Sequence, residues 1–201
     1  MWLGSRFVLA AITALAICAA AVPAAGAGSL LGLNNDCGAA SQPFAQFGDS
    51  RLYTFGTNGG LESGDTGWGL SGASVVKGNE SYFVHSGADK YSLSLPAGSS
   101  AVTPQLCMGT TSTVLRFFDR SGNGGTVRVQ IVMRNVLGTV LGVVDWTTIS
   151  GSSAWRPSPS LLNLDSLLGL LGVSSIQLKF TALSGTTQID DVYVDPWWSR
   201  S

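Results

Sequence analysis

The stretches Asn58-Gly59-Gly60-Leu61-Glu62 and Gln188-Ile189-Asp190-Asp191-Val192-Tyr193-Val194 decide the fold of this chain. The first is typical of a short strand with a Gly-Gly turn, and the second of a strand that carries an Asp-Asp turn. A first and a last strand of this kind can meet edge to edge. We therefore expect the two ends of the folded domain to lie together, with Glu62 close to Asp190.

Between these stretches the sequence predicts short strands separated by glycine-rich turns. Many short strands and turn glycines in one domain are typical of an antiparallel β-sandwich, and we predict an all-β fold. The expected strands are 51–55, 60–62, 68–71, 74–77, 91–95, 101–108, 114–120, 126–134, 140–149, 174–182 and 187–194, with a turn expected at 121–125.

Alternation within the strands predicts which faces are buried. Along 126–134, Val127 and Ile131 belong to an apolar row, while Arg128 and Gln130 belong to a polar one. A strand with period-2 patterning places one face on a core and the other in water. We expect the polar row to face solvent.

One segment does not follow this pattern. Leucines 161, 164, 167, 168 and 171 share one face of a helix, Ser160 is a suitable N-cap and Gly172 a suitable end. The spacing predicts one short amphipathic helix between late strands, with its leucines closing an open end of the sandwich.

The first 27 residues are typical of a secretory signal peptide. Arg6 precedes an apolar run over 7–22, and Ala25-Gly26-Ala27 offers a small-x-small cleavage pattern. A membrane anchor is the alternative, but no Lys/Arg cluster follows the run. We expect cleavage near Ala27, export from the cell and no membrane span in the mature chain.

Charge and cysteine content limit the remaining possibilities. The formal net charge of −1 is too low to favour nucleic acid as a partner. Cys37 and Cys107 remain after cleavage, and two cysteines in an exported protein most often pair; two separate buried thiols are the alternative. We predict a disulfide that ties an N-terminal extension, 28–50, to a sandwich domain over 51–201.

With these elements in place, residues 51–195 resemble the galactose-binding-like jelly roll of carbohydrate-binding modules. The matching pieces are the two opening stretches, Gly67-Trp68, the strands between 114 and 149, and Trp155 at the start of a strand. The chain also resembles an uncharacterised group of secreted actinobacterial proteins through Ser92–Ser100 and the terminal Ile189–Pro196. The first resemblance implies a jelly roll in which Trp68 and Trp155 are core residues.

The same resemblance implies a structural calcium ion at the junction of the two ends. The residues that match the ligands are the carbonyls of Gly60 and Lys90 and the carboxylates of Glu62 and Asp190. A third carboxylate is replaced by Gly87, so we expect Asp89 or Asp191 to assist, since calcium takes 6–8 oxygen ligands. The alternative is that Glu62 and Asp190 simply accept backbone N–H groups.

The sequence predicts a binding protein and no enzyme. The single histidine, His85, has no Gly-x-Ser-x-Gly elbow to accompany it. Sugars are bound by polar side chains together with aromatic rings. We predict a carbohydrate-binding face, the alternative being a structural or adhesive envelope protein without a sugar ligand. The predicted ligand-binding residues are Arg116, Arg128, Gln130, Arg134, Trp146 and Tyr82, with Gln177, Lys179 and Phe83 nearby.

Overall fold

The structure, a computed structural model, describes residues 37–107, 113–160 and 172–196. The described part is all-β apart from one short 3-10 helix, and every pair of named strands is antiparallel. The elements are β1 (Ala40–Ser41), η1 (Ala45–Phe47), β2 (Tyr53–Phe55), β3 (Gly69–Ser71), β4 (Ser74–Lys77), β5 (Tyr91–Pro96), β6 (Ser100–Val102), β7 (Val114–Arg134), β8 (Val140–Ser150), β9 (Arg156–Pro157) and β10 (Ser175–Asp195).

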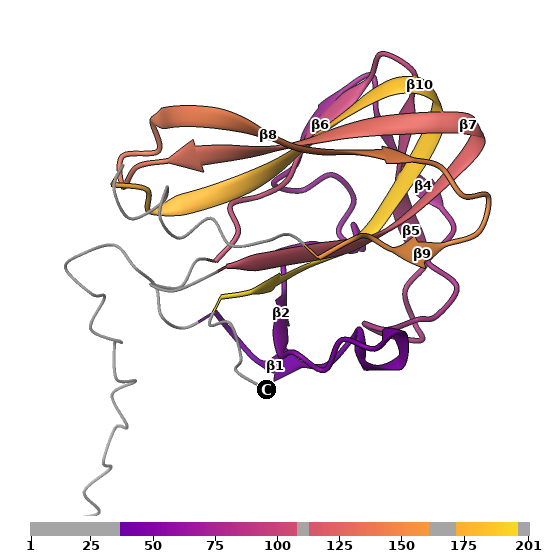
Figure 1. Ribbon diagram of the computed structural model, residues 1–201, viewed down its shortest axis with the longest axis horizontal. Helices are drawn as coiled ribbons and strands as arrows, with labels where there is room; N and C mark the ends of the chain where they lie inside the picture. Colours follow the sequence, from indigo (N-terminus) through magenta and orange to yellow (C-terminus); the bar gives the residue numbers. More distant parts are fainter. Residues whose placement is uncertain (1–36, 108–112, 161–171, 197–201) are drawn as a thin grey trace, which may run out of the picture.

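Two long strands, β7 and β10, build both layers of the sandwich (Figure 1). Residues 114–120 of β7 pair with the end of β10, and residues 126–134 pair with its beginning. Between these halves both strands bend, with register shifts on either side of Ser184. A Cβ at Gly125 would lie 2.8 Å from the carbonyl oxygen of Thr186, so the close approach at the bend requires glycine.

The bend corrects two predictions. The sequence predicts a turn at 121–125 and separate strands before and after it, but the chain continues as one strand through these residues. The predicted strands 174–182 and 187–194 are likewise one strand, β10. Glycine-rich stretches are ambiguous because the same residues suit a turn and a sharply bent strand.

One layer contains β8, the second half of β7, the first half of β10, β6 and β3. The other contains β9, the first half of β7, the second half of β10, β5, β4 and β2, to which β1 is added. This arrangement is the predicted antiparallel jelly-roll sandwich. Within the described residues, no helix is long and apolar enough to cross a membrane.

The main core fills the space between the layers. The apolar row of β7 that alternation predicts, including Val127, Val129 and Ile131, is buried there against Leu178 and Phe180 of β10. Trp68 is also buried in this core, with its ring 6.5 Å from that of Phe180, as the resemblance implies.

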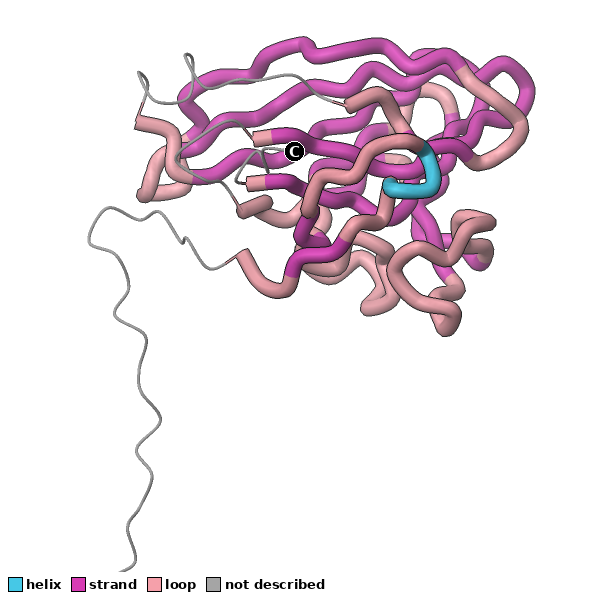
Figure 2. The backbone as a smooth tube through the Cα atoms, turned by 60° about the horizontal axis from the view of Figure 1, so that its bottom comes forward, coloured by secondary structure: helices cyan, strands magenta, loops and turns pink. Residues whose placement is uncertain are grey.

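A second apolar cluster lies on the outer side of the β9–β7–β10–β5 layer. Trp155 belongs to it, so the prediction that this tryptophan is buried is also confirmed. Residues 37–50 cover the cluster by inserting Phe44 among Tyr53, Phe118 and Tyr193. Figure 2 shows η1, the short helix of this segment, lying on the outside of the strands.

The predicted disulfide between Cys37 and Cys107 is present, with the two Cα atoms 5.6 Å apart. It joins the start of the covering segment to the chain after β6. The predicted signal peptide and the predicted leucine-rich helix over 161–171 lie outside the described residues.

Candidate metal centre and binding face

Asn58 shapes the loop at the first of the two meeting ends. Its side-chain amide donates to the carbonyl oxygens of Gly64 and Thr66, at 2.9 and 3.0 Å, and its Oδ1 accepts from the backbone of Ser63. The loop is a series of turns in which Leu61 has a φ of +58°, so the predicted strand over 60–62 is wrong. Asn58 and Gly59 act here as turn residues.

The two ends meet as predicted. The backbone N–H of Gly56 donates to the carbonyl of Val192 at 2.9 Å, and that of Val192 donates to Gly59 at 3.3 Å. A Cβ at Gly60 would lie 2.8 Å from Oδ1 of Asp191. The Asp-Asp pair of the last strand therefore lies directly against the glycine turn.

Carboxylates also organise the loop between β4 and β5. Glu80 accepts the backbone N–H groups of Tyr82 and Val84, and its own N–H donates to Oδ2 of Asp190 at 2.8 Å. Glu62 accepts the N–H groups of Lys90 and Tyr91 at 2.7 and 2.8 Å. The loop is thus wrapped around acidic side chains from three segments of the chain.

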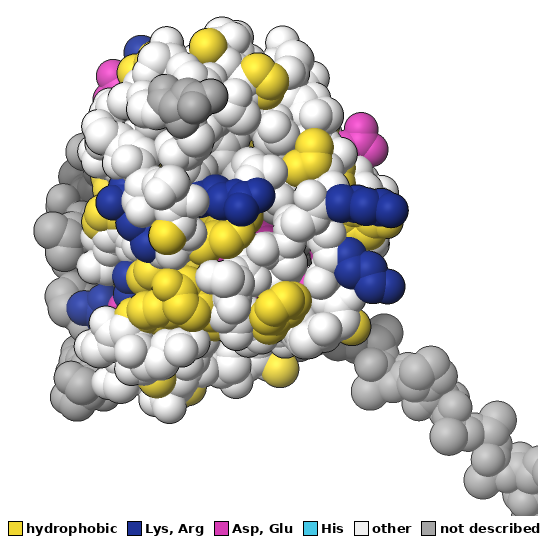
Figure 3. All heavy atoms as spheres, turned by 90° about the vertical axis from the view of Figure 1, so that its right-hand side faces the viewer, with side chains coloured by type: hydrophobic (Ala, Val, Ile, Leu, Met, Phe, Trp, Pro, Cys, Tyr) yellow, Lys and Arg dark blue, Asp and Glu magenta, His cyan; other side chains and the backbone are white. Residues whose placement is uncertain are grey.

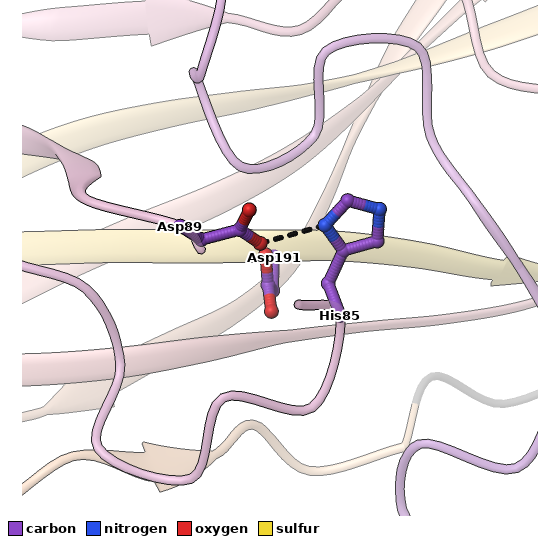
Figure 4. Close-up of side chains that lie close together, drawn as sticks. All are labelled: His85, Asp89 and Asp191. Atoms are coloured by element: carbon purple, nitrogen blue, oxygen red, sulfur yellow. Dashed lines mark hydrogen bonds and ion pairs between the residues drawn. The ribbon is translucent and has the colours of Figure 1, made fainter. Parts of the chain in front are cut away.

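At the centre of this arrangement lie His85, Asp89 and Asp191, each with one potential ligand atom within 4.8 Å of the others. Figure 4 shows the Asp89 carboxylate pointing toward the His85 ring, whose Nδ1 is 2.6 Å from Oδ2 of Asp89, with Asp191 beside it. The imidazole of His85 also stacks on the ring of Phe55, with the two ring centroids 3.8 Å apart.

Asp191 is the unusual member of the group. Its backbone lies in the left-handed region, at a φ of +47°, where β10 has a register shift. The residue is fully buried, and neither of its carboxylate oxygens has a hydrogen-bond partner among the described residues. Buried carboxylates are normally bonded to N–H groups or to a cation.

Several carboxyl groups lie close together at this site, and burial and mutual repulsion raise the pKa of some of them. Burial, and then the charges of Glu80 and Asp89, raise the pKa of Asp191 to about 8. The backbone amide of His85 offsets part of this rise without reaching hydrogen-bond geometry. Burial and the Asp191 charge raise the pKa of Asp190 to about 9, and burial also raises the pKa of Glu80.

These residues fit a divalent cation that prefers oxygen ligands. The orphaned carboxylate of Asp191 and the neighbouring Asp89 supply hard oxygen donors, and a cation would offset the mutual repulsion of the acids. Of the predicted ligands, Gly60 and Asp190 lie beside Asp191, and Glu62 is joined to the backbone of Lys90. The sequence singled out Asp190, whereas the structure leaves Asp191 as the acid without hydrogen bonds.

Three of the six predicted ligand-binding residues share one surface. Arg128, Gln130 and Arg134 lie on the outer side of β7, opposite the core row. Their partners on β10 are Thr181, Lys179 and Ser175, in that order. Gln130 donates to Oδ1 of Asp145 at 2.7 Å, and Arg134 donates to Gln177 and to the carbonyl of Gly138. This surface also includes Gln177 and Thr148, and we call it the polar face.

The other three predicted residues do not lie on the polar face. Arg116 is buried in the opposite layer, with its guanidinium 4.4 Å from the centre of the Phe44 ring. Tyr82 lies on the loop before β5 and donates its hydroxyl to the carbonyl of Trp155. Trp146 is half-buried and packs against the main core, edge-on to Phe117. Alternation could not separate these residues because it identifies a face within one strand only.

Sequence comparison finds no matching family model and no matching curated protein, so the resemblance to a secreted actinobacterial group is not supported. Among solved structures, the chain is similar to a CBM61 module in complex with β-1,4-galactotriose, at 19% identity and a TM-score of 0.47, covering 69% of this chain and 95% of that one.

Two further solved structures are similar at the level of strand arrangement. One holds the CBM22-1 and GH10 modules of a Clostridium thermocellum xylanase complexed with xylohexaose, at 13% identity and a TM-score of 0.46, covering 68% of this chain and 27% of that one. The other is a C-terminal CBM6 of a laminarinase from Zobellia galactanivorans, at 15% identity and a TM-score of 0.42, covering 71% and 97%.

Proposed function

We propose that the protein is an extracellular, non-catalytic domain that binds carbohydrate on the polar face. The observation that carries this proposal is the continuous row of donors and acceptors across β8, β7 and β10, formed by Thr148, Arg128 and Thr181 and by Gln130 and Lys179. Side chains of these types bond the hydroxyl groups of sugars.

Part of the hydrogen-bonding capacity of this row is not used within the described residues. Nε of Arg128 and Oγ1 of Thr181, on directly paired residues, have no hydrogen-bond partner among the described residues. Polar groups beneath a surface are usually bonded to protein or water. Both atoms are buried, so the groups of the row that a ligand would meet are the exposed Thr148 hydroxyl and the side chains of Gln130 and Lys179.

The disulfide between Cys37 and Cys107 supports an extracellular location, since such bonds persist in oxidising compartments. His85, the single histidine, is hydrogen-bonded to Asp89 and stacked on Phe55, which supports a structural rather than a catalytic role for it.

Affinity electrophoresis through gels containing different neutral polysaccharides tests the carbohydrate proposal. The wild type should be retarded by at least one polymer, and Arg128→Ala and Gln130→Ala should each weaken this retardation. Arg51→Ala is the matched control, because Arg51 lies away from the polar face, beside Asp49. Retardation that neither substitution weakens, or no retardation by any polymer, would overturn the proposal.

A second candidate is a structural or adhesive envelope protein stabilised by calcium, and the bare carboxylate of Asp191 favours it. Asp191, Asp89 and Asp190 would hold the ion, with Glu62 and the carbonyls of Gly60 and Lys90 as the further ligands expected from the sequence. Bound calcium would neutralise the acidic cluster and stabilise the folded state alone. Equal melting temperatures in EDTA and in excess calcium would exclude this role for the ion.

A further inference from the structure

A hollow lies on the other layer, away from the polar face. It has a volume of about 360 Å³ and is lined by Arg120, Gly122, Ser153, Thr186 and Gln188. These residues come from β7, from β10 and from the connection between β8 and β9. All of the lining side chains carry hydrogen-bonding groups, apart from the glycine.

Arg120 is held in one orientation at this hollow. Its Nε–H donates to Oε1 of Gln188, the residue paired with it on β10, and its Cζ lies 5.0 Å above the centre of the Trp155 ring. With Nε engaged in this way, the two Nη groups are the donors that a ligand in the hollow would meet. An arginine fixed before binding loses less side-chain entropy when a ligand arrives.

Further cations belong to chain segments next to Arg120. Gly78 lies close to Arg120, since a Cβ at this glycine would lie 3.8 Å from Nη2 of Arg120. The residue before Gly78 is the exposed Lys77. The N–H of Gly78 donates to the carbonyl of Lys90, which is also exposed. Arg156, which is 43% exposed, pairs with Asp119, the neighbour of Arg120 on β7. Arg120 thus lines the hollow, while Lys77, Lys90 and Arg156 belong to chain segments next to it.

Two of the acidic groups near these cations are buried, and a third, Glu62, is exposed but is engaged by the backbone N–H groups of Lys90 and Tyr91. Asp119 and Glu80 are both fully buried, and Glu80 is engaged by backbone N–H groups. Figure 3 shows the consequence: Lys and Arg side chains form a band across this side of the molecule, next to apolar patches, with little Asp or Glu exposed among them. The chain as a whole has a formal net charge of −1, so this positive surface is local.

We propose that this hollow binds the acid group, a carboxylate or a sulfate, of an anionic polysaccharide. A planar guanidinium matches the two oxygens of such a group, and the lysines and Arg156 attract the charged polymer. The side chains of Ser153, Thr186 and Gln188 are suited to the neighbouring hydroxyl groups. This inference rests on the proposed carbohydrate-binding function and adds to it a ligand class and a second surface.

The experiment compares binding of the full protein to polygalacturonate, to carboxyl-reduced polygalacturonate, to a sulfated galactan and to its desulfated form. Binding to an acidic polymer should weaken as salt is added and should be lost when the acid groups are removed. Arg120→Ala should weaken it about tenfold, as expected for the loss of a charge-assisted contact of about 1.4 kcal/mol. Arg51→Ala, which removes an arginine that lies beside Asp49 and does not line the hollow, should leave this binding unchanged.

Two further variants control for the possibility that Arg120→Ala weakens binding only because it disturbs the fold. Arg120→Lys keeps the charge but loses the planar fork, and the double substitution Lys77→Ala/Lys90→Ala changes only exposed side chains. Both should weaken binding to the acidic polymer while the melting temperature stays near that of the wild type.

The outcomes separate the inference from the proposed function. Binding to neutral polymer that depends on Arg128, with no preference for the acidic form, would overturn the inference and leave the proposed function standing. Acidic binding that depends on Arg120 alone would support the inference and remove the polar face as the site. Equal, Arg120-dependent binding to duplex DNA would show that the hollow accepts any polyanion, and would overturn the assignment to carbohydrate.

Discussion

The guanidinium of Arg116 and the carboxylate of Asp49 form an ion pair, with Nη1 2.8 Å from Oδ2, that joins β7 to the N-terminal segment. Both side chains are about one-tenth exposed, at 10% and 11%. Nε and Nη2 of Arg116 donate to the carbonyl of Ser158 at 3.1 and 2.8 Å. Burial alone would raise the pKa of Asp49, but hydrogen bonds from Tyr53, Arg51 and Arg116 outweigh it and lower the pKa.

Replacing Arg116 should therefore destabilise the fold strongly. Arg116→Ala leaves the Asp49 carboxylate and the Ser158 carbonyl without their partner and removes the group stacked on Phe44, so we expect a loss of about 3–5 kcal/mol in the free energy of unfolding. Urea unfolding followed by tryptophan fluorescence measures it. Lys179→Ala, on the polar face, is the control and should change the free energy by no more than about 0.5 kcal/mol. A small effect of Arg116→Ala would show that residues 37–50 are only loosely attached.

Asp191→Asn should remove the response of the protein to calcium. In the wild type, calcium at a hundred times its dissociation constant should stabilise the fold by about 2.7 kcal/mol. The variant should melt higher than the wild type in EDTA at pH 8, because one buried charge is gone, and calcium should raise its melting temperature little. The exposed acid Asp65 provides the control, Asp65→Asn, which should respond to calcium like the wild type. An unaltered calcium response in Asp191→Asn would exclude this carboxylate as a ligand.

Without calcium, the stability of the protein should fall as pH rises from about 4 to 8. The pKa of Asp191 is about 8 in the folded state against 3.8 as its ordinary value, and that of Asp190 is about 9. The folded state therefore holds protons that the unfolded state releases over this window, and the stabilisation they give is lost as pH approaches the folded-state values.

Melting temperatures measured in EDTA across this pH range check the sign. Excess calcium should reverse the trend, because the ion binds the deprotonated acids and its binding releases protons. A melting temperature in EDTA that climbs steadily from pH 5 to pH 8 would contradict the assignment of raised pKa values to these two aspartates.

Gly59→Ala should disturb the contact between the two ends of the domain. A Cβ at this position would lie 2.8 Å from the carbonyl oxygen of Val192 and 3.1 Å from that of Gly56, and backbone atoms cannot move aside cheaply. We expect a loss of about 1–3 kcal/mol, the usual cost of overpacking. Gly87→Ala is the matched control, since nothing lies within 4 Å of its Cβ position. Thermal melting of both variants makes the comparison, and equal melting temperatures would count against a tight junction.

The sequence predicts the sandwich because its evidence is local. Alternation along 126–134 identifies the core row, and the glycine turn and the Ile-Asp-Asp stretch identify the two ends of the domain that meet. The disulfide follows from cysteine count and compartment. Each of these features depends on residues close in sequence or on a simple count, and the structure confirms them.

The candidate site is harder to predict from the sequence. Nothing in the spacing shows that Glu80 would cap the loop before β5, or that His85 would approach Asp89 and Asp191, because these contacts arise from the path of an irregular loop. Arg116 and Arg128 look alike in alternation, yet the bend of β7 places one under the N-terminal segment and the other in solvent contact. A bend of this kind is a tertiary event that period-2 patterning does not record.

The sharing of β7 and β10 between both layers also bears on how the chain reaches its native state. Val114 pairs with Asp195 in one layer, and Arg134 pairs with Ser175 in the other, so the same two segments must find each other before either layer is complete. Such non-local pairing closes a long loop early and slows folding. Neither layer can form independently of the other. The domain should therefore acquire its core in a single slow cooperative step.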